Sequence, residues 1–93
     1  GLTATAIATP GHTPGDLTFD IAGSLFSGDL LFYRSIGRTD FPGGDFAELL
    51  ASVAKLAARY PASTPVYPGH MQSTTLGDEL AENPFLGGLG NHG

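Results

Sequence analysis

The sequence of 93 residues contains no cysteine. Neither a disulfide framework nor a thiolate metal site is therefore available to hold its fold. No apolar run approaches the roughly 20 residues that a membrane-spanning helix needs. The sequence also shows no positively charged start followed by a short apolar stretch, the pattern of a secretory signal. We expect a cytoplasmic protein that is stabilised by packing, by a bound metal, or by another chain or a missing segment.

Basic residues are also scarce. Four Lys and Arg stand against nine Asp and Glu, the net charge is −5, and the basic residues form no cluster. Nucleic acids and anionic membranes are bound through basic patches, so we expect neither as a partner. A chain of this length forms at most one small domain with a thin core, because such a domain buries only about 60–65% of its surface.

Fourteen glycines and seven prolines separate short apolar stretches along the chain. The pattern predicts strands over residues 2–8, 17–21, 24–27 and 65–67. In the second of these strands a period of two places Leu17, Phe19 and Ile21 toward the core. Residues 32–44 show no periodicity, and within them residues 35–44 are predicted to form a long loop, which in small domains is often functional.

Two helices are predicted from their capping residues. Asp45, with Glu48 three residues later, has the spacing of a capping box. Apolar residues then follow at helical spacing until Pro61, which ends the helix. Thr75 is the expected N-cap of a second, shorter helix over residues 76–82.

Three side chains are candidate metal ligands: His12, Asp29 and His70. Each follows a predicted strand and lies in a segment that proline or glycine restricts, so its backbone is held still. Imidazole and carboxylate are ligands that zinc, iron and manganese accept. The ordinary alternatives stay open, because a loop histidine is often a surface residue and Gly-Asp is often a turn. His92, in a glycine-rich tail, is expected to be such a surface histidine.

Five short motifs, in this order, resemble the C-terminal half of the metallo-β-lactamase superfamily, and most closely its short glyoxalase II-like hydrolases: residues 9–15, 26–29, 37–40, 67–70 and 83–86. The resemblance implies an αββα sandwich in which residues 1–93 form one β-sheet-plus-helix layer of mixed α/β (α+β) class. It implies that His12 binds a first metal, that Asp29 bridges two metals, and that His70 binds the second. Zinc is the expected metal, with two ions per complete site, and iron or manganese are possible replacements.

The family's His-x-His-x-Asp-His string, which belongs to the N-terminal half, does not occur in this sequence. We therefore expect a half-site that is inactive alone, with no catalytic residue beyond the metal ligands. The missing N-terminal half, or self-association, would complete it. In the complete enzyme the resemblance implies hydrolysis of a thioester, such as a hydroxyacyl-glutathione, by a metal-bound hydroxide.

Arg38 and Tyr33 are the candidate substrate-binding residues. The resemblance implies that Arg38 contacts a carboxylate of the glutathione portion, whereas pairing with Asp40 is the structural alternative. Tyr33 lines the thioester pocket or packs in the core. Met71 and Gln72 follow His70, where the glutathione-specific members have an acid and a tyrosine. The resemblance therefore supports thioester hydrolysis better than it supports glutathione as the thiol.

Two other functions remain open at this point. One is a persulfide dioxygenase with a single iron, a relative that shares the motif of residues 37–40. The other is a non-catalytic half-domain that associates with a partner through an exposed apolar face.

Overall fold

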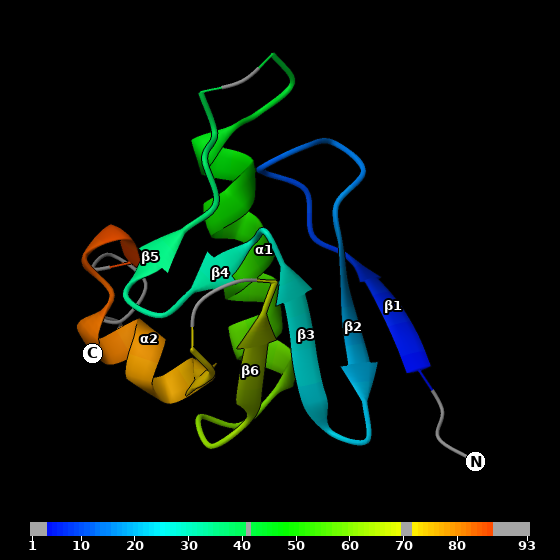
Figure 1. The fold of residues 1–93 in the computed structure, drawn as a ribbon, viewed down its shortest axis with the longest axis vertical. Helices are drawn as coiled ribbons and strands as arrows, with labels where there is room; N and C mark the ends of the chain where they lie inside the picture. The colour runs from blue at the N-terminus through cyan, green and yellow to red at the C-terminus, as the bar shows by residue number, and fades with distance from the viewer. Residues whose placement is uncertain (1–3, 41, 70–71, 87–93) are drawn as a thin grey trace.

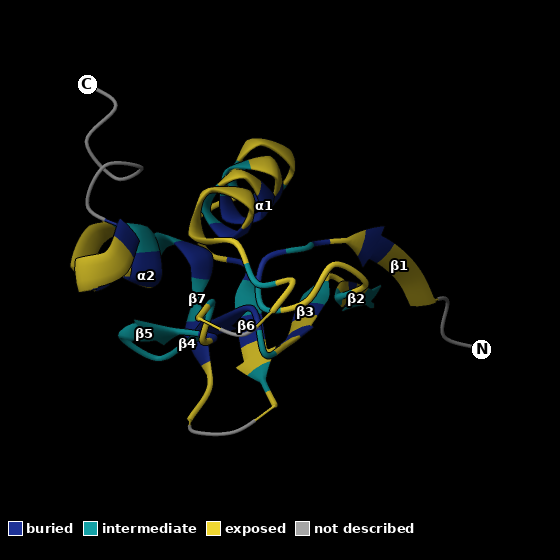
Figure 2. Cartoon of the chain, turned by 90° about the horizontal axis from the view of Figure 1, so that it is seen from above, coloured by how far each residue is buried: buried dark blue, intermediate teal, exposed yellow. Residues whose placement is uncertain are grey.

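The computed structural model describes residues 4–40, 42–69 and 72–86. Its elements are β1 (Ala4–Ala8), β2 (Leu17–Ile21), β3 (Ser24–Gly28), β4 (Leu31–Phe32), β5 (Ser35–Ile36), α1 (Phe46–Arg59), β6 (Pro65–Pro68), β7 (Thr74–Thr75), α2 (Leu76–Glu82) and the 3₁₀ turn η1 (Pro84–Leu86). Five strands form a sheet in the order β1-β2-β3-β6-β7, and α1 lies across one of its faces (Figures 1 and 2). The arrangement is the predicted α+β layer of one sheet and its helices.

The sheet is antiparallel from β1 to β3, and β3 then pairs with β6 in parallel. Helix α1 makes the crossover between these two parallel strands (Figure 1). Parallel neighbours end at the same edge of a sheet, so the segments that follow β3 and β6 start side by side. The core lies between the sheet and the helices and consists of Ile7, Leu25, Leu30, Leu31, Leu49, Val53, Leu56, Val66, Leu76 and Leu86.

Both helices begin at the predicted capping residues. The Asp45 carboxylate accepts the Glu48 N–H at 3.0 Å, and α1 ends at Arg59, just before Pro61. The Thr75 hydroxyl accepts the Asp78 N–H at 3.2 Å at the start of α2. None of the helices in the described part of the chain is long and apolar enough to cross a membrane.

The predicted inward face of β2 was wrong. Leu17 and Phe19 are 45% and 40% exposed, whereas Thr18 is fully buried. The face under α1 takes Thr18, opposite Ile7, and the Thr18 and Thr9 hydroxyls satisfy each other at 2.9 Å. The alternation was therefore read correctly, but the apolar set lies on the face that α1 leaves uncovered (Figure 2).

The prediction of a long loop over residues 35–44 was also wrong at its start, because Ser35 and Ile36 form β5, which pairs with β4 in a hairpin. The turn between these strands holds Arg34 at a φ of 56°. A glycine or asparagine usually marks such a left-handed position, so arginine gave no sequence signal for it. For the first strand, residues 2 and 3 lie outside the described residues, and β1 begins at Ala4.

Candidate metal centre

The candidate ligands follow the ends of strands that meet at one edge of the sheet. Strand β3 ends at Gly28, which has a φ of 55° and turns the chain into Asp29. The N–H of Gly69, which follows β6, donates to the Gly28 carbonyl at 2.9 Å. The backbone just before His70 is therefore fastened beside Asp29. His70 itself lies outside the described residues.

His12 lies in a loop whose base and interior are both hydrogen-bonded. The Thr9 N–H donates to the Asp16 carbonyl at 2.9 Å and closes the base. Within the loop, the backbone N–H and the hydroxyl of Thr13 donate to the Asp16 carboxylate at 2.8 and 2.7 Å. This local network explains why the Pro/Gly-rich stretch has one defined shape around His12.

Helix α1 fastens the same loop from the other side. The Asp45 N–H donates to the Gly11 carbonyl at 2.8 Å, and the Ser52 hydroxyl donates to the Pro10 carbonyl at 2.7 Å. A Cβ at position 11 would overlap the backbone and Cβ of Leu49, so only glycine permits this close approach. The segment that carries His12 is therefore held against the first turns of α1.

His12 and Asp29 approach each other across this edge. The Nε2 atom of His12 is 4.0 Å from Oδ2 of Asp29, and both side chains reach solvent, with exposures of 21% and 45%. The Nδ1 atom of His12 is 2.7 Å from the Arg38 carbonyl. A carbonyl only accepts hydrogen bonds, so Nδ1 donates, and in the neutral ring the lone pair is then on Nε2, which is on the Asp29 side.

The arrangement fits two ligands of a divalent metal ion. Tetrahedral zinc with bonds of about 2.0–2.2 Å holds two donor atoms about 3.3–3.6 Å apart, so these two donors would share an ion after closing by less than about 1 Å. A metal-binding histidine commonly donates its other N–H to a carbonyl or carboxylate, as His12 does to Arg38. Among residues 4–40, 42–69 and 72–86, no group of three His, Cys, Asp or Glu is arranged to hold a metal ion.

Gly37 and the Arg38 carbonyl are parts of this site that the sequence did not reveal. A Cβ at position 37 would overlap the Asp29 carbonyl oxygen and would lie 3.3 Å from the Cβ of His12. The only signal in the sequence was a glycine inside a stretch without periodicity, which is typical of close backbone approach. A backbone carbonyl has no signature of its own.

Arg38 pairs with Asp40 in the structure. Its Nε and Nη2 atoms donate to the two oxygens of Asp40 at 3.1 and 3.0 Å, and both side chains are 67% exposed. The hydrogen bonds from Arg38 lower the pKa of Asp40 below its ordinary value. Tyr33 is half-buried, and the guanidinium carbon of Arg34 lies 4.4 Å from the centre of its ring. Substrate binding by Arg38 and Tyr33 stays a prediction.

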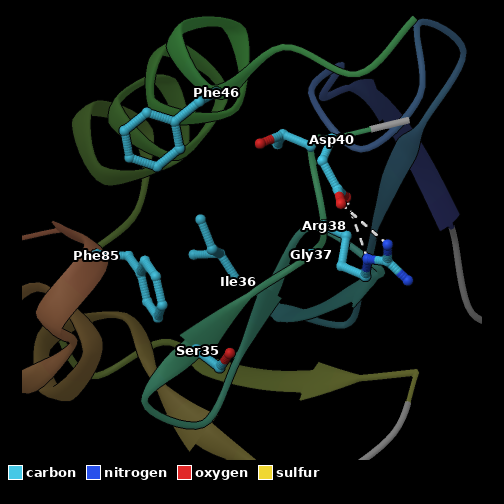
Figure 3. A pocket seen from close by; sticks show the side chains of 8 residues that line it. Ser35, Ile36, Gly37, Arg38, Asp40, Phe46 and Phe85 are labelled. Carbon is cyan, nitrogen blue, oxygen red and sulfur yellow. Dashed lines mark hydrogen bonds and ion pairs between the residues drawn. The ribbon is translucent and has the colours of Figure 1, made fainter. Parts of the chain in front are cut away.

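A cavity of about 570 Å³ lies beside the site. Figure 3 shows Ile36, Phe46 and Phe85 facing it from three separate segments. Arg38 and Asp40 also line it, and their paired side chains lie to the right in this view. The volume is in the range of small-molecule sites, and its lining is mostly apolar. The cavity therefore shares one wall, at Gly37, with the His12–Asp29 pair.

The chain is similar to proteins of known family. A family model for the metallo-beta-lactamase superfamily matches residues 1–70. Hydroxyacylglutathione hydrolase GloC from Haemophilus influenzae is 42% identical over 79 residues, which cover 83% of this chain and 37% of GloC. The crystal structure of ETHE1 from Myxococcus xanthus matches with a TM-score of 0.86 at 35% identity, covering 94% of this chain and 40% of that one.

A third similar protein, TTHA1623, has a crystal structure in a di-iron-bound form. It matches with a TM-score of 0.83 at 46% identity, covering 89% of this chain and 42% of that one. The chain thus spans about two fifths of the length of each of these three relatives, from 37% of GloC to 42% of TTHA1623. The match over residues 1–70, these identities and the shared fold show that the chain belongs to the metallo-β-lactamase superfamily, a superfamily of metal-dependent hydrolases.

Proposed function

We propose that this chain is one layer of a glyoxalase II-like hydrolase that uses zinc to cleave a thioester such as a hydroxyacyl-glutathione. The observation that carries the proposal is the approach of His12 Nε2 to Asp29 Oδ2 at 4.0 Å, with His12 Nδ1 fixed by the Arg38 carbonyl. The similarity to GloC over 83% of the chain supports this proposal.

In this proposal His12 and Asp29 hold metal, and His70 adds a third ligand. A bound divalent ion supplies Lewis-acid polarisation of the thioester carbonyl and makes a water molecule more acidic. The Arg38 carbonyl keeps the His12 ring in the orientation that presents Nε2. Each of the two metals would receive from this layer one histidine and the shared Asp29 carboxylate. Two donors per metal are too few for tight binding, so this layer alone is expected to be inactive.

The substrate is proposed to lie along the wall formed by residues 36–38. Arg38 would bind a carboxylate of the thiol portion in place of Asp40. Breaking the Arg38–Asp40 pair costs little free energy, because an exposed ion pair contributes little to stability. The apolar cavity at Ile36, Phe46 and Phe85 would receive an uncharged part of the substrate. Tyr33 is proposed to border the same substrate through the β4–β5 turn. A thioester of an intracellular thiol implies a cytoplasmic location, with neither nucleic acid nor membrane as partner.

The face of the sheet opposite α1 is proposed to be covered by a second layer. Phe19, Phe26 and Tyr67 are 39–41% exposed there, and Phe26 and Tyr67 stack with ring centres 5.2 Å apart. Aromatic side chains in register across three strands form an apolar surface that favours burial. The occupant is the N-terminal layer of the sandwich or, in its absence, a second copy of this chain.

The test is thioester hydrolysis by the intact protein, measured with its metal content. His12→Ala and Asp29→Ala are each expected to lower the metal content and to abolish hydrolysis. Tyr60→Phe is the matched control, because it removes the 2.7 Å hydrogen bond from Tyr60, just after α1, to Asp20, away from the metal pair. Full hydrolysis by the His12 and Asp29 variants would refute the proposal.

A persulfide dioxygenase is the second candidate, because the described pair of donors suits a single ion. One iron per chain, with oxygen consumption and no thioester hydrolysis, would establish that function instead.

A further inference from the structure

Glu79, on α2, is a fully buried carboxylate that lies outside the metal pair. Among the described residues it is the one acidic side chain in the buried set. Its oxygens accept four hydrogen bonds: from the Arg34 N–H at 2.7 Å, Arg34 Nη1 at 2.5 Å, the Thr74 hydroxyl at 2.6 Å and Asn83 Nδ2 at 3.0 Å. A buried carboxylate requires such partners. The donors come from the β4–β5 turn (Arg34, twice), from β7 (Thr74) and from the residue after α2 (Asn83).

These bonds fasten the β4–β5 hairpin to α2. Arg34 occupies the left-handed position of the hairpin turn, at a φ of 56°, and Glu79 binds both its backbone N–H and its guanidinium. Asn83, one turn after Glu79, donates its Nδ2 to the Ser35 carbonyl at 2.9 Å as well as to Glu79. A strained backbone position persists only where its surroundings hold it, and here the surroundings are the Glu79 carboxylate.

The hairpin leads directly into the wall of the metal pair. After Ile36, the Gly37 N–H donates to the Leu30 carbonyl at 3.1 Å, and the Gly37 backbone lies against Asp29 and His12. The next carbonyl, that of Arg38, accepts the Nδ1–H of His12 at 2.7 Å. Only three residues therefore separate Arg34, the turn residue held by Glu79, from Arg38, whose carbonyl orients His12.

We propose that Glu79 is a positioning residue for His12, acting through Arg34 and Asn83 on the hairpin that carries the Arg38 carbonyl. The inference rests on the proposed function in one respect, that His12 is a metal ligand. It differs from a role in stability alone, because it requires the His12 ring to change when the Glu79 network is broken. The group that accepts the other N–H of a ligating histidine, here the Arg38 carbonyl, fixes its tautomer, and losing such a partner commonly costs about 10–100-fold in metal affinity.

The experiment compares Glu79→Ala and Asn83→Ser with wild type in the intact protein. Asn83→Ser is the milder change, because serine retains an oxygen near the Phe85 N–H, which Asn83 Oδ1 accepts at 2.9 Å, but loses the amide that reaches Ser35. Nitrogen-15 NMR of the metal-free protein reports the tautomer of His12, whose signals are assigned by their absence from a His12→Gln variant. Chelator competition gives the zinc dissociation constant.

The proposal predicts that both variants lose the predominance of the Nδ1–H tautomer and bind zinc about 10–100-fold more weakly. Tyr60→Phe, which removes an α1 hydrogen bond to β2, should change neither quantity. An unchanged tautomer and zinc affinity in Asn83→Ser and in every Glu79 variant that folds would overturn the proposal. Wild-type protein that binds no zinc would refute the proposed function, and the tautomer measurement would still decide the role of Glu79.

Discussion

Replacing Gly37 with alanine tests how closely the 36–38 segment must approach the metal pair. A Cβ at this position would overlap the Asp29 carbonyl oxygen and lie 3.3 Å from the Cβ of His12. Neither neighbouring atom is the far end of a flexible side chain, so the added carbon cannot be accommodated by a rotamer change. The backbone of residues 36–38 must therefore move away from the sheet edge.

This movement is expected to lower both stability and metal affinity. Overpacking a close contact costs about 1–3 kcal/mol, which lowers the Tm of the intact protein in proportion. The hydrogen bond from the Gly37 N–H to the Leu30 carbonyl, 3.1 Å long, would weaken. The Arg38 carbonyl would also move away from His12 Nδ1. We expect zinc affinity to fall about 10–100-fold, because the His12 ring loses the partner that orients it.

Gly15→Ala is the matched control, because no atom lies within 4 Å of a Cβ built at that glycine. It should leave zinc affinity unchanged and should be neutral or stabilising by about 0.4–1 kcal/mol, since alanine restricts the unfolded chain. Thermal unfolding and chelator-competition titration of both variants provide the measurements. Equal Tm values and equal zinc affinities in Gly37→Ala and Gly15→Ala would refute the close-approach reasoning.

Three further predictions concern hydrogen bonds and titrating groups. Ser52→Ala removes the donor to the Pro10 carbonyl, 2.7 Å away, and should lower the free energy of unfolding by about 1–3 kcal/mol in urea denaturation; an unchanged denaturation midpoint would contradict it. The hydrogen bonds from Arg38 lower the pKa of Asp40, so the contribution of this pair is complete above the ordinary aspartate pKa of about 3.9 and is lost as pH falls below it. Carboxyl carbon-13 titration should show the Asp40 pKa rising in Arg38→Gln, and an equal pKa in both proteins would count against the pair. Burial, followed by the hydrogen bond to Asp20, raises the pKa of Tyr60; the resulting stabilisation is complete below the ordinary tyrosine pKa of about 10 and is lost as pH rises through the higher folded value. The dependence of stability on alkaline pH should therefore weaken in Tyr60→Phe, and an identical profile in this variant would refute the assignment.

Much of the fold could be predicted because local rules and tertiary structure agree. Asp45 and Thr75 cap the helices that their spacing predicted, and proline and glycine separate the strands as expected. Which face of β2 packs against the core could not be predicted. The alternation in its sequence shows only that every second residue lies on the same face. Helix α1 covers the Thr18 face, and no local signal in β2 identifies where that helix will pack.

The candidate site was predictable only where side chains carry it. His12 and Asp29 were identified from their residue types and from the restricted loops that hold them, and the structure brings them within 4.0 Å. The Arg38 carbonyl and the turn at Arg34 were not predictable, since both depend on backbone geometry. Arginine gives no warning of a φ of 56°, which Glu79 stabilises from a helix 45 residues later in the chain.

Crystals of the intact protein grown with zinc would test the central claim most directly, through anomalous diffraction at the zinc absorption edge. The account predicts an anomalous peak at about 2.0–2.2 Å from both His12 Nε2 and Asp29 Oδ2, with His12 Nδ1 still donating to the Arg38 carbonyl. Zinc bound elsewhere, or coordinated through Nδ1 of His12, would contradict it.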